Sequence, residues 1–187
     1  MSRGPSRLSR PSAGLLFAGV LLVVTALAGC GLGAPNVAVA TDTPVPLASL
    51  SPAIELTRAQ IESALKARGI GLIRPNAPFI PPQDASLVDV PRGVFQAVLG
   101  ADPGAGYIVV YELPDAAAAA TAAQTQAMWI ASGPGAVQFT PGTKHVIRVV
   151  GNTVVTFSRS PEARDPREAD VGAVLESLGQ GVPVPTT

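Results

Sequence analysis

Apolar residues recur at helical spacing near the end of the chain, between Val171 and Leu178, at positions i, i+3, i+4 and i+7. Asp165 precedes this run as a candidate N-cap, and a proline follows it at the first helical position. Glu168 then occupies the third helical position, and Gly179 stands where the helix should stop. The pattern predicts a helix that buries one side.

Two earlier segments also predict helices. Thr57 and Gln60 match a capping box, so we expect a helix over about Arg58–Arg68 that stops at Gly69. Residues 114–133, PDAAAAATAAQTQAMWIASG, have the strongest intrinsic helix propensity in the chain because alanine favours the helix more than any other residue.

Runs of β-branched and aromatic residues lie between these helices. Residues 70–74 predict a short strand that ends before a proline, and residues 85–100 and 106–113 predict an antiparallel pair divided by the turn-rich ADPGA. Residues 143–150 and 153–159 flank a Gly-Asn turn, which is typical of a β-hairpin.

The order of these elements is α-β-β-β-α-β-β-α, which favours an α+β domain. We expect one antiparallel sheet of about four to five strands, with three helices packed largely on one face. About 125 residues can bury a real hydrophobic core of modest size.

The amino terminus has a different pattern, in which three arginines without any acid precede an uncharged run from Gly14 to Gly29. This order is typical of a secretory signal, and the run is shorter than the ~20 residues of a membrane-spanning helix. A transmembrane anchor is the alternative. Residues 27–30 read L-A-G-C, which resembles the lipobox of bacterial lipoproteins.

That resemblance implies cleavage between Gly29 and Cys30 and attachment of a diacylglyceryl group to the Cys30 thiol. N-acylation, for example with palmitate, can follow at the new amino terminus. A lipid with two or three acyl chains is enough for stable anchoring. The implied location is extracytoplasmic, on the cell membrane, with sorting to an outer membrane left open for a host that has one.

The chain therefore divides into four predicted parts. Residues 1–29 are the signal peptide, and residues 30–55 are the lipidated cysteine with a Pro/Ala/Thr-rich tether. Residues 56–180 form a single α+β domain, and residues 181–187 are a disordered tail. An edge strand through residues 36–40, NVAVA, is the alternative for part of the tether.

Charge and composition exclude several classes of function. Loss of the signal removes three of the 13 basic residues and none of the 13 acidic ones, which leaves a net charge of −3. No basic cluster suits nucleic acid or an anionic membrane surface. With one cysteine, committed to lipid, and one histidine, no disulfide or His/Cys zinc set is expected. No cofactor is expected.

Candidate chemistry is sparse. His145, Trp129 and Tyr111 are weak candidates for a ligand site, with a sheet histidine and core aromatic residues as the simpler interpretations. The chain has no G-x-S-x-G elbow and no Walker-type phosphate loop. Paired carboxylates for a hydrolase would have to come from four acids that sequence cannot place together: Asp84, Asp89, Glu112 and Asp115.

A second resemblance spans about Leu65–Gly179. Val90-Pro91, Tyr111-Glu112 and Thr140-Pro141 match the pattern of a small uncharacterised α+β domain found in lipoproteins of high-GC bacteria. The sequence departs from that pattern at Phe139, where tryptophan is usual, and in the three residues that separate Pro141 from His145. The resemblance implies a fold and no activity.

These observations predict a lipid-anchored lipoprotein that is not an enzyme. Its expected role is to bind a protein or another component of the cell envelope. The alternative is a single-domain lipoprotein that binds a small molecule, and a carboxylate-based hydrolase is a third interpretation.

Overall fold

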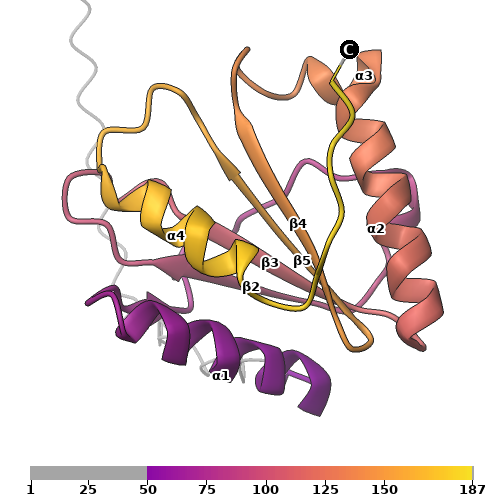
Figure 1. The fold of residues 1–187 in the computed structure, drawn as a ribbon, viewed down its shortest axis with the longest axis horizontal. Helices are drawn as coiled ribbons and strands as arrows, with labels where there is room; N and C mark the ends of the chain where they lie inside the picture. Colours follow the sequence, from indigo (N-terminus) through magenta and orange to yellow (C-terminus); the bar gives the residue numbers. More distant parts are fainter. Residues whose placement is uncertain (1–49, 187) are drawn as a thin grey trace, which may run out of the picture. The chain divides into compact units, whose positions relative to one another are not determined.

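The computed structural model describes residues 50–186, and its central feature is a six-stranded antiparallel sheet in the order β1-β2-β3-β5-β4-β6 (Figure 1). The strands are β1 (Leu72–Ile73), β2 (Arg92–Ala97), β3 (Tyr107–Glu112), β4 (Lys144–Val150), β5 (Thr153–Arg159) and β6 (Gln180–Gly181). The α+β class and the antiparallel sheet are confirmed. The short strand predicted at residues 70–74 forms as the edge strand β1, and the sheet is wider than the expected four to five strands because β6 extends the other edge.

Two hairpins form the middle of the sheet. β2 pairs with β3 as predicted, and β4 pairs with β5 around Gly151, whose φ of 60° suits the tight turn. β3 and β5 join the hairpins at the centre, with Val110 opposite Val155. Because side chains alternate along a strand, both faces of these central strands carry apolar residues.

The helices divide between the two faces. α1 (Pro52–Lys66) and α4 (Arg167–Glu176) lie together on one face, and α2 (Ala116–Ala131) covers the other (Figure 1). The sequence predicts all three helices largely on one face, whereas the structure has two helices on one face and α2 on the other. Two short helices, η1 (Ala85–Leu87) and α3 (Gly133–Ala136), complete the fold.

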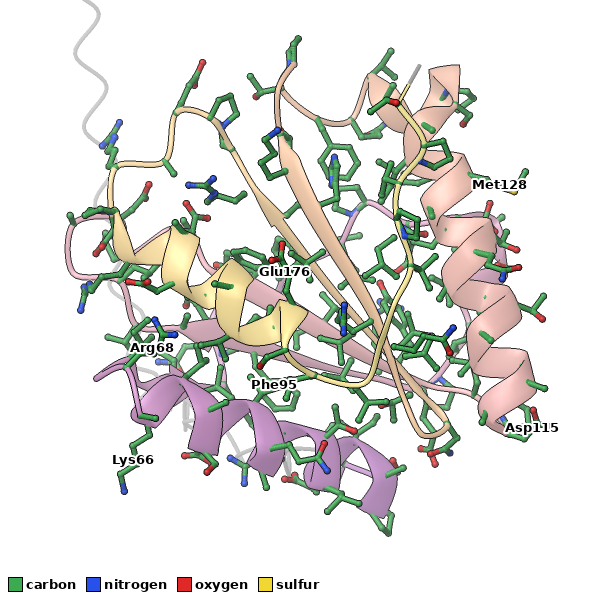
Figure 2. All side chains as sticks on the ribbon, viewed as in Figure 1. Lys66, Arg68, Phe95, Asp115, Met128 and Glu176 are labelled. Atoms are coloured by element: carbon green, nitrogen blue, oxygen red, sulfur yellow. The ribbon has the colours of Figure 1, made fainter. Side chains whose placement is uncertain are left out.

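The face under α1 and α4 holds the larger core, called here the α1/α4 core. Phe95 of β2 is fully buried there (Figure 2), and with Phe157 of β5 it contributes the largest side chains of the cluster. Ile61 and Leu65 of α1 and Leu175 of α4 close over the strands with no exposed surface. The predicted apolar side of α4 is therefore confirmed.

The opposite face holds the α2 core, which is built on small residues. Ala119, Ala123 and Ala127 repeat every fourth position along α2 and are buried against Val109 and Val154 of the sheet. Alanine side chains let the helix backbone approach the sheet closely. Asp115 is the N-cap of α2 and accepts a hydrogen bond from the Ala118 amide at 2.8 Å.

α1 begins earlier than the sequence pattern predicts. Ser51 is the N-cap and accepts a bond from the Ile54 amide at 3.3 Å, so residues 52–55 are helical rather than part of a tether. Thr57, the expected cap, is buried and shares a 2.9 Å hydrogen bond with the hydroxyl of Thr153. The helix ends as expected before Gly69, whose φ is 70°. The predicted signal, Cys30 and the remainder of the tether lie outside the described residues.

The expected disordered tail packs on the domain as far as Val184. β6 pairs with β4, and the Val182 amide donates to the Ile147 carbonyl at 3.0 Å. Val182 and Val184 are half-buried against the α2 core. These contacts use backbone groups and two spaced valines, so composition alone did not reveal them.

Candidate functional site

A pocket of about 270 Å³ lies at the end of the sheet where β3 starts and β5 finishes. Most of its lining is on the α2 face, and Phe157 and Glu168 reach it from the α1/α4 face. His145, Val109 and Thr156 lie on its floor, from three neighbouring strands. The second half of α2 forms one side through Gln126 and Ile130. The pocket therefore lies beside the α2 core and shares its strands.

Aromatic rings form the walls. Phe79, from the loop before η1, stacks on Tyr107 with ring centroids 4.0 Å apart and planes 3° from parallel. Phe139, from the loop before β4, meets His145 edge-on at 4.5 Å. All four side chains are half-buried. Each ring therefore packs on the protein on one side and leaves its other side toward the open pocket.

The proline-rich loop that carries Phe79 is fixed by two buried side chains. Gln126 accepts a hydrogen bond from the Asp84 amide at 2.7 Å and donates to the Pro82 carbonyl at 3.3 Å. The Tyr111 hydroxyl donates to the side-chain oxygen of Gln83 at 2.7 Å. This wall is therefore held in place without any ligand.

His145 is in the pocket and has a local partner. Its Nδ1 lies 2.9 Å from the Ser158 hydroxyl on the adjacent strand β5. Burial lowers the pKa of the imidazole, so His145 is neutral at pH 7. The simpler interpretation, a sheet histidine with a nearby hydrogen-bond partner, therefore describes its contacts, and its ring also lines the candidate site.

The other two aromatic candidates do not line the pocket. Tyr111 is 1% exposed within the α2 core, and this burial raises its pKa to about 12. It supports the pocket wall from behind through Gln83. Trp129 packs against the α2 core near the end of α2, in agreement with the alternative of a core residue.

Glu168 lies in the pocket lining, a residue that sequence reasoning treated only as part of a helix cap. It is 3% exposed, and its Oε2 is the one buried side-chain oxygen or nitrogen within residues 50–186 that has no hydrogen-bond partner. Burial, then the nearby Asp102 carboxylate, raises its pKa, while Arg159 acts in the opposite direction. Its spacing could have revealed it, because position 168 precedes the buried Val171 by three residues.

Groupings expected of other chemistries are not found in the described part of the chain. No set of three or more His, Cys, Asp or Glu side chains there could hold a metal ion. Asp84 and Asp115, two of the acids considered for a hydrolase, each accept a backbone hydrogen bond at a helix start. None of the helices between residues 50 and 186 has the length and apolar character needed to cross a membrane.

Comparison of the chain with protein-family models, with curated proteins and with solved structures finds no match. The case for a function therefore rests on the pocket and on the sequence.

Proposed function

We propose that this chain is a lipid-anchored extracytoplasmic protein whose folded domain binds a small, mostly apolar molecule in the pocket beside α2. The observation that carries the proposal is the pocket itself. Its volume of about 270 Å³ lies just below the ~300–1,000 Å³ of typical ligand sites, which suits a ligand smaller than a drug-sized one. Ring walls with a few polar groups are the usual composition of such sites.

The polar groups favour binding over catalysis. A serine–histidine pair becomes a nucleophile when a third group orients the histidine. Among the described residues, His145 has Ser158 as its only side-chain hydrogen-bond partner, and no carboxylate contacts its ring nitrogens. The pair can instead offer one donor and one acceptor to a ligand.

The anchor rests on the L-A-G-C sequence at residues 27–30. Acylation needs the thiol of Cys30, so Cys30→Ser is expected to leave an uncleaved precursor without lipid. Metabolic labelling of cells with a fatty-acid analogue, followed by electrophoresis, measures this directly. Equal labelling of the wild type and the serine variant would refute the anchor and leave the pocket proposal intact.

The binding proposal is tested by a thermal-shift screen of small neutral and charged compounds on the full-length chain. A ligand that binds only the folded state stabilises it by about 2.7 kcal/mol at a concentration of 100 Kd. Thr156→Phe places a ring on the pocket floor and should abolish the shift. Thr121→Phe makes the same change at an exposed position of α2 and should preserve the shift.

A screen without any stabilising compound would contradict the proposal. An equal response from the wild type and Thr156→Phe would show that the compounds bind elsewhere. In either case the pocket would lose its assigned role.

One observation favours the second candidate, the predicted binding of a protein or envelope component. Ile80 and Val137 are the most exposed large apolar side chains in the described region, at 84% and 78%. Each lies within two residues of a pocket wall, Phe79 or Phe139. A macromolecule that covered the pocket mouth would bury them.

Photo-crosslinking in intact cells distinguishes this candidate. A crosslinking residue at Val137 should capture one partner reproducibly, whereas one at Met128 should not. Met128 is also strongly exposed, at 67%, and projects from the outer side of α2 (Figure 2). The same capture pattern at both positions would contradict a specific partner at the pocket mouth.

A further inference from the structure

The unpartnered oxygen of Glu168 indicates what the pocket recognises. A buried carboxylate without a hydrogen-bond partner is costly, and native structures rarely retain one without a role. Here the carboxylate is 3% exposed, belongs to the pocket lining and has no partner on Oε2. A ligand that donates a hydrogen bond would satisfy this oxygen.

The groups around Glu168 do not supply that donor. Asp165 is engaged by the Arg167 guanidinium at 2.7 Å and the Ala101 amide at 3.0 Å. Asp102 accepts a bond from the Arg164 amide at 3.3 Å. Arg159 is the nearby cation, but among the described residues no ion pair within 4.0 Å joins it to Glu168.

The two neighbouring carboxylates, Asp102 and Asp165, also place negative charge at this end of the pocket, and the nearby Arg159 offsets part of it. Both raise the pKa of Glu168, which shows that they disfavour a further negative charge there. By the same electrostatics they favour a positive charge placed beside Glu168. Aromatic rings such as Phe79 and Phe139 present electron-rich faces that also attract cations.

We propose that the pocket selects a small organic amine, with its ammonium group on Glu168 Oε2 and its apolar body against the aromatic walls. This inference rests on the proposed binding function. The volume of about 270 Å³ equals roughly nine water molecules at about 30 Å³ each, which fits a ligand on the order of ten non-hydrogen atoms.

The test is isothermal titration calorimetry on the full-length chain in nonionic detergent, with the heat of titration into empty micelles subtracted. The probes are 2-phenylethylamine and 2-phenylethanol, which share a shape and differ in charge. The wild type should bind the amine at least about tenfold more tightly than the alcohol, since a hydrogen bond to a charged group is worth about that factor or more.

Glu168→Gln keeps the shape of the side chain and removes its charge. In this variant the dissociation constants of the amine and the alcohol should differ by no more than about threefold. The affinity for the alcohol should stay nearly constant. Glu176→Gln is the matched control, because Glu176 is an exposed acid in the last turn of the same helix (Figure 2). It should retain the wild-type preference.

Glu168→Asp provides a second variant if the glutamine variant does not fold. It keeps the charge and withdraws it by one methylene, so the preference should be intermediate.

Three results would overturn the inference. The first is equal or tighter binding of the alcohol by the wild type, and the second is an unchanged amine preference in both Glu168 variants. The third is a failure of the amine to bind at millimolar concentration. The thermal-shift screen separates the two proposals, because stabilising neutral compounds that Thr156→Phe excludes would leave the binding function standing without amine selectivity.

Discussion

Gln126 connects the stability of the domain with the shape of the pocket, so Gln126→Ala is an informative perturbation. The side chain is 2% exposed and holds the loop at Pro82 and Asp84 through two hydrogen bonds, of 2.7 and 3.3 Å. Each bond is worth about 0.5–1.5 kcal/mol, and an unsatisfied backbone amide at Asp84 adds about 1–3 kcal/mol. The longer bond belongs at the low end, which gives an expected loss of about 2–5 kcal/mol in the free energy of unfolding.

The assay is urea denaturation of the full-length chain, followed by tryptophan fluorescence from the half-buried Trp129. With a urea dependence of about 2 kcal/mol per molar, the middle of the usual range, the unfolding midpoint should fall by about 1–2.5 M. Gln124→Ala is the control, because Gln124 is exposed on the same helix. Its effect should stay within about 0.5 kcal/mol.

The loop also carries Phe79, so Gln126→Ala should weaken the thermal shift caused by any pocket ligand. Equal midpoints for the Gln126 and Gln124 variants would refute the reasoning, since the loop would then be held by other contacts. A destabilised Gln126 variant with an unchanged ligand response would show that the wall does not depend on this side chain.

The remaining predictions concern two carboxylates and the tail. The hydrogen bond from Arg167, followed by that from the Ala101 amide, holds the pKa of Asp165 well below its usual range. The ionised Asp165 carboxylate therefore stabilises the fold above about pH 3.9, and this stabilisation fades as the pH falls further. Asp165→Asn should therefore lower the urea midpoint at pH 7 and converge with the wild type in acid; a constant difference across the range would contradict this. The pKa of Glu168 is raised, so the folded state holds its proton more tightly and stability falls as the pH rises from about 4.3 through the raised value. Glu168→Gln should raise the urea midpoint at pH 7, and this gain should vanish below about pH 4.3. A variant less stable than the wild type at pH 7 would contradict this prediction. Deletion of residues 182–187 removes two half-buried valines and should cost about 1–3 kcal/mol, which an unchanged midpoint would disprove.

The elements that sequence predicts well are those whose evidence is local. The apolar spacing of α4, the alanine run of α2 and the Gly-Asn turn of the β4–β5 hairpin each reside in a few neighbouring residues, and each forms where expected. The start of α1 was missed because Ser51 and Pro52 sit in a proline-rich stretch that reads as a linker. β6 was missed because Gln180 and Gly181 pair with β4 through the backbone alone, which leaves no pattern of side chains.

The site could be predicted only in part. His145 stood out because it is the one histidine of the chain, and it does line the pocket. Phe79, Phe139 and Glu168 come from three segments that the fold brings together, so no local motif marks them. Glu168 could have been predicted, because it lies three residues before Val171 and helical spacing therefore places this charged residue on the buried face of α4.

Phe79 and Phe139 stand in loops, and neither belongs to a strand of the sheet. The hydrogen bonds between the strands and the packing of the α1/α4 core therefore do not depend on which side chains occupy these two positions. A single substitution at either wall would recontour the pocket while every strand pair stays intact. A lineage that carries this domain could accordingly exchange one ligand for another by individual mutations, whose cost in stability would fall on the α2 core that both rings border.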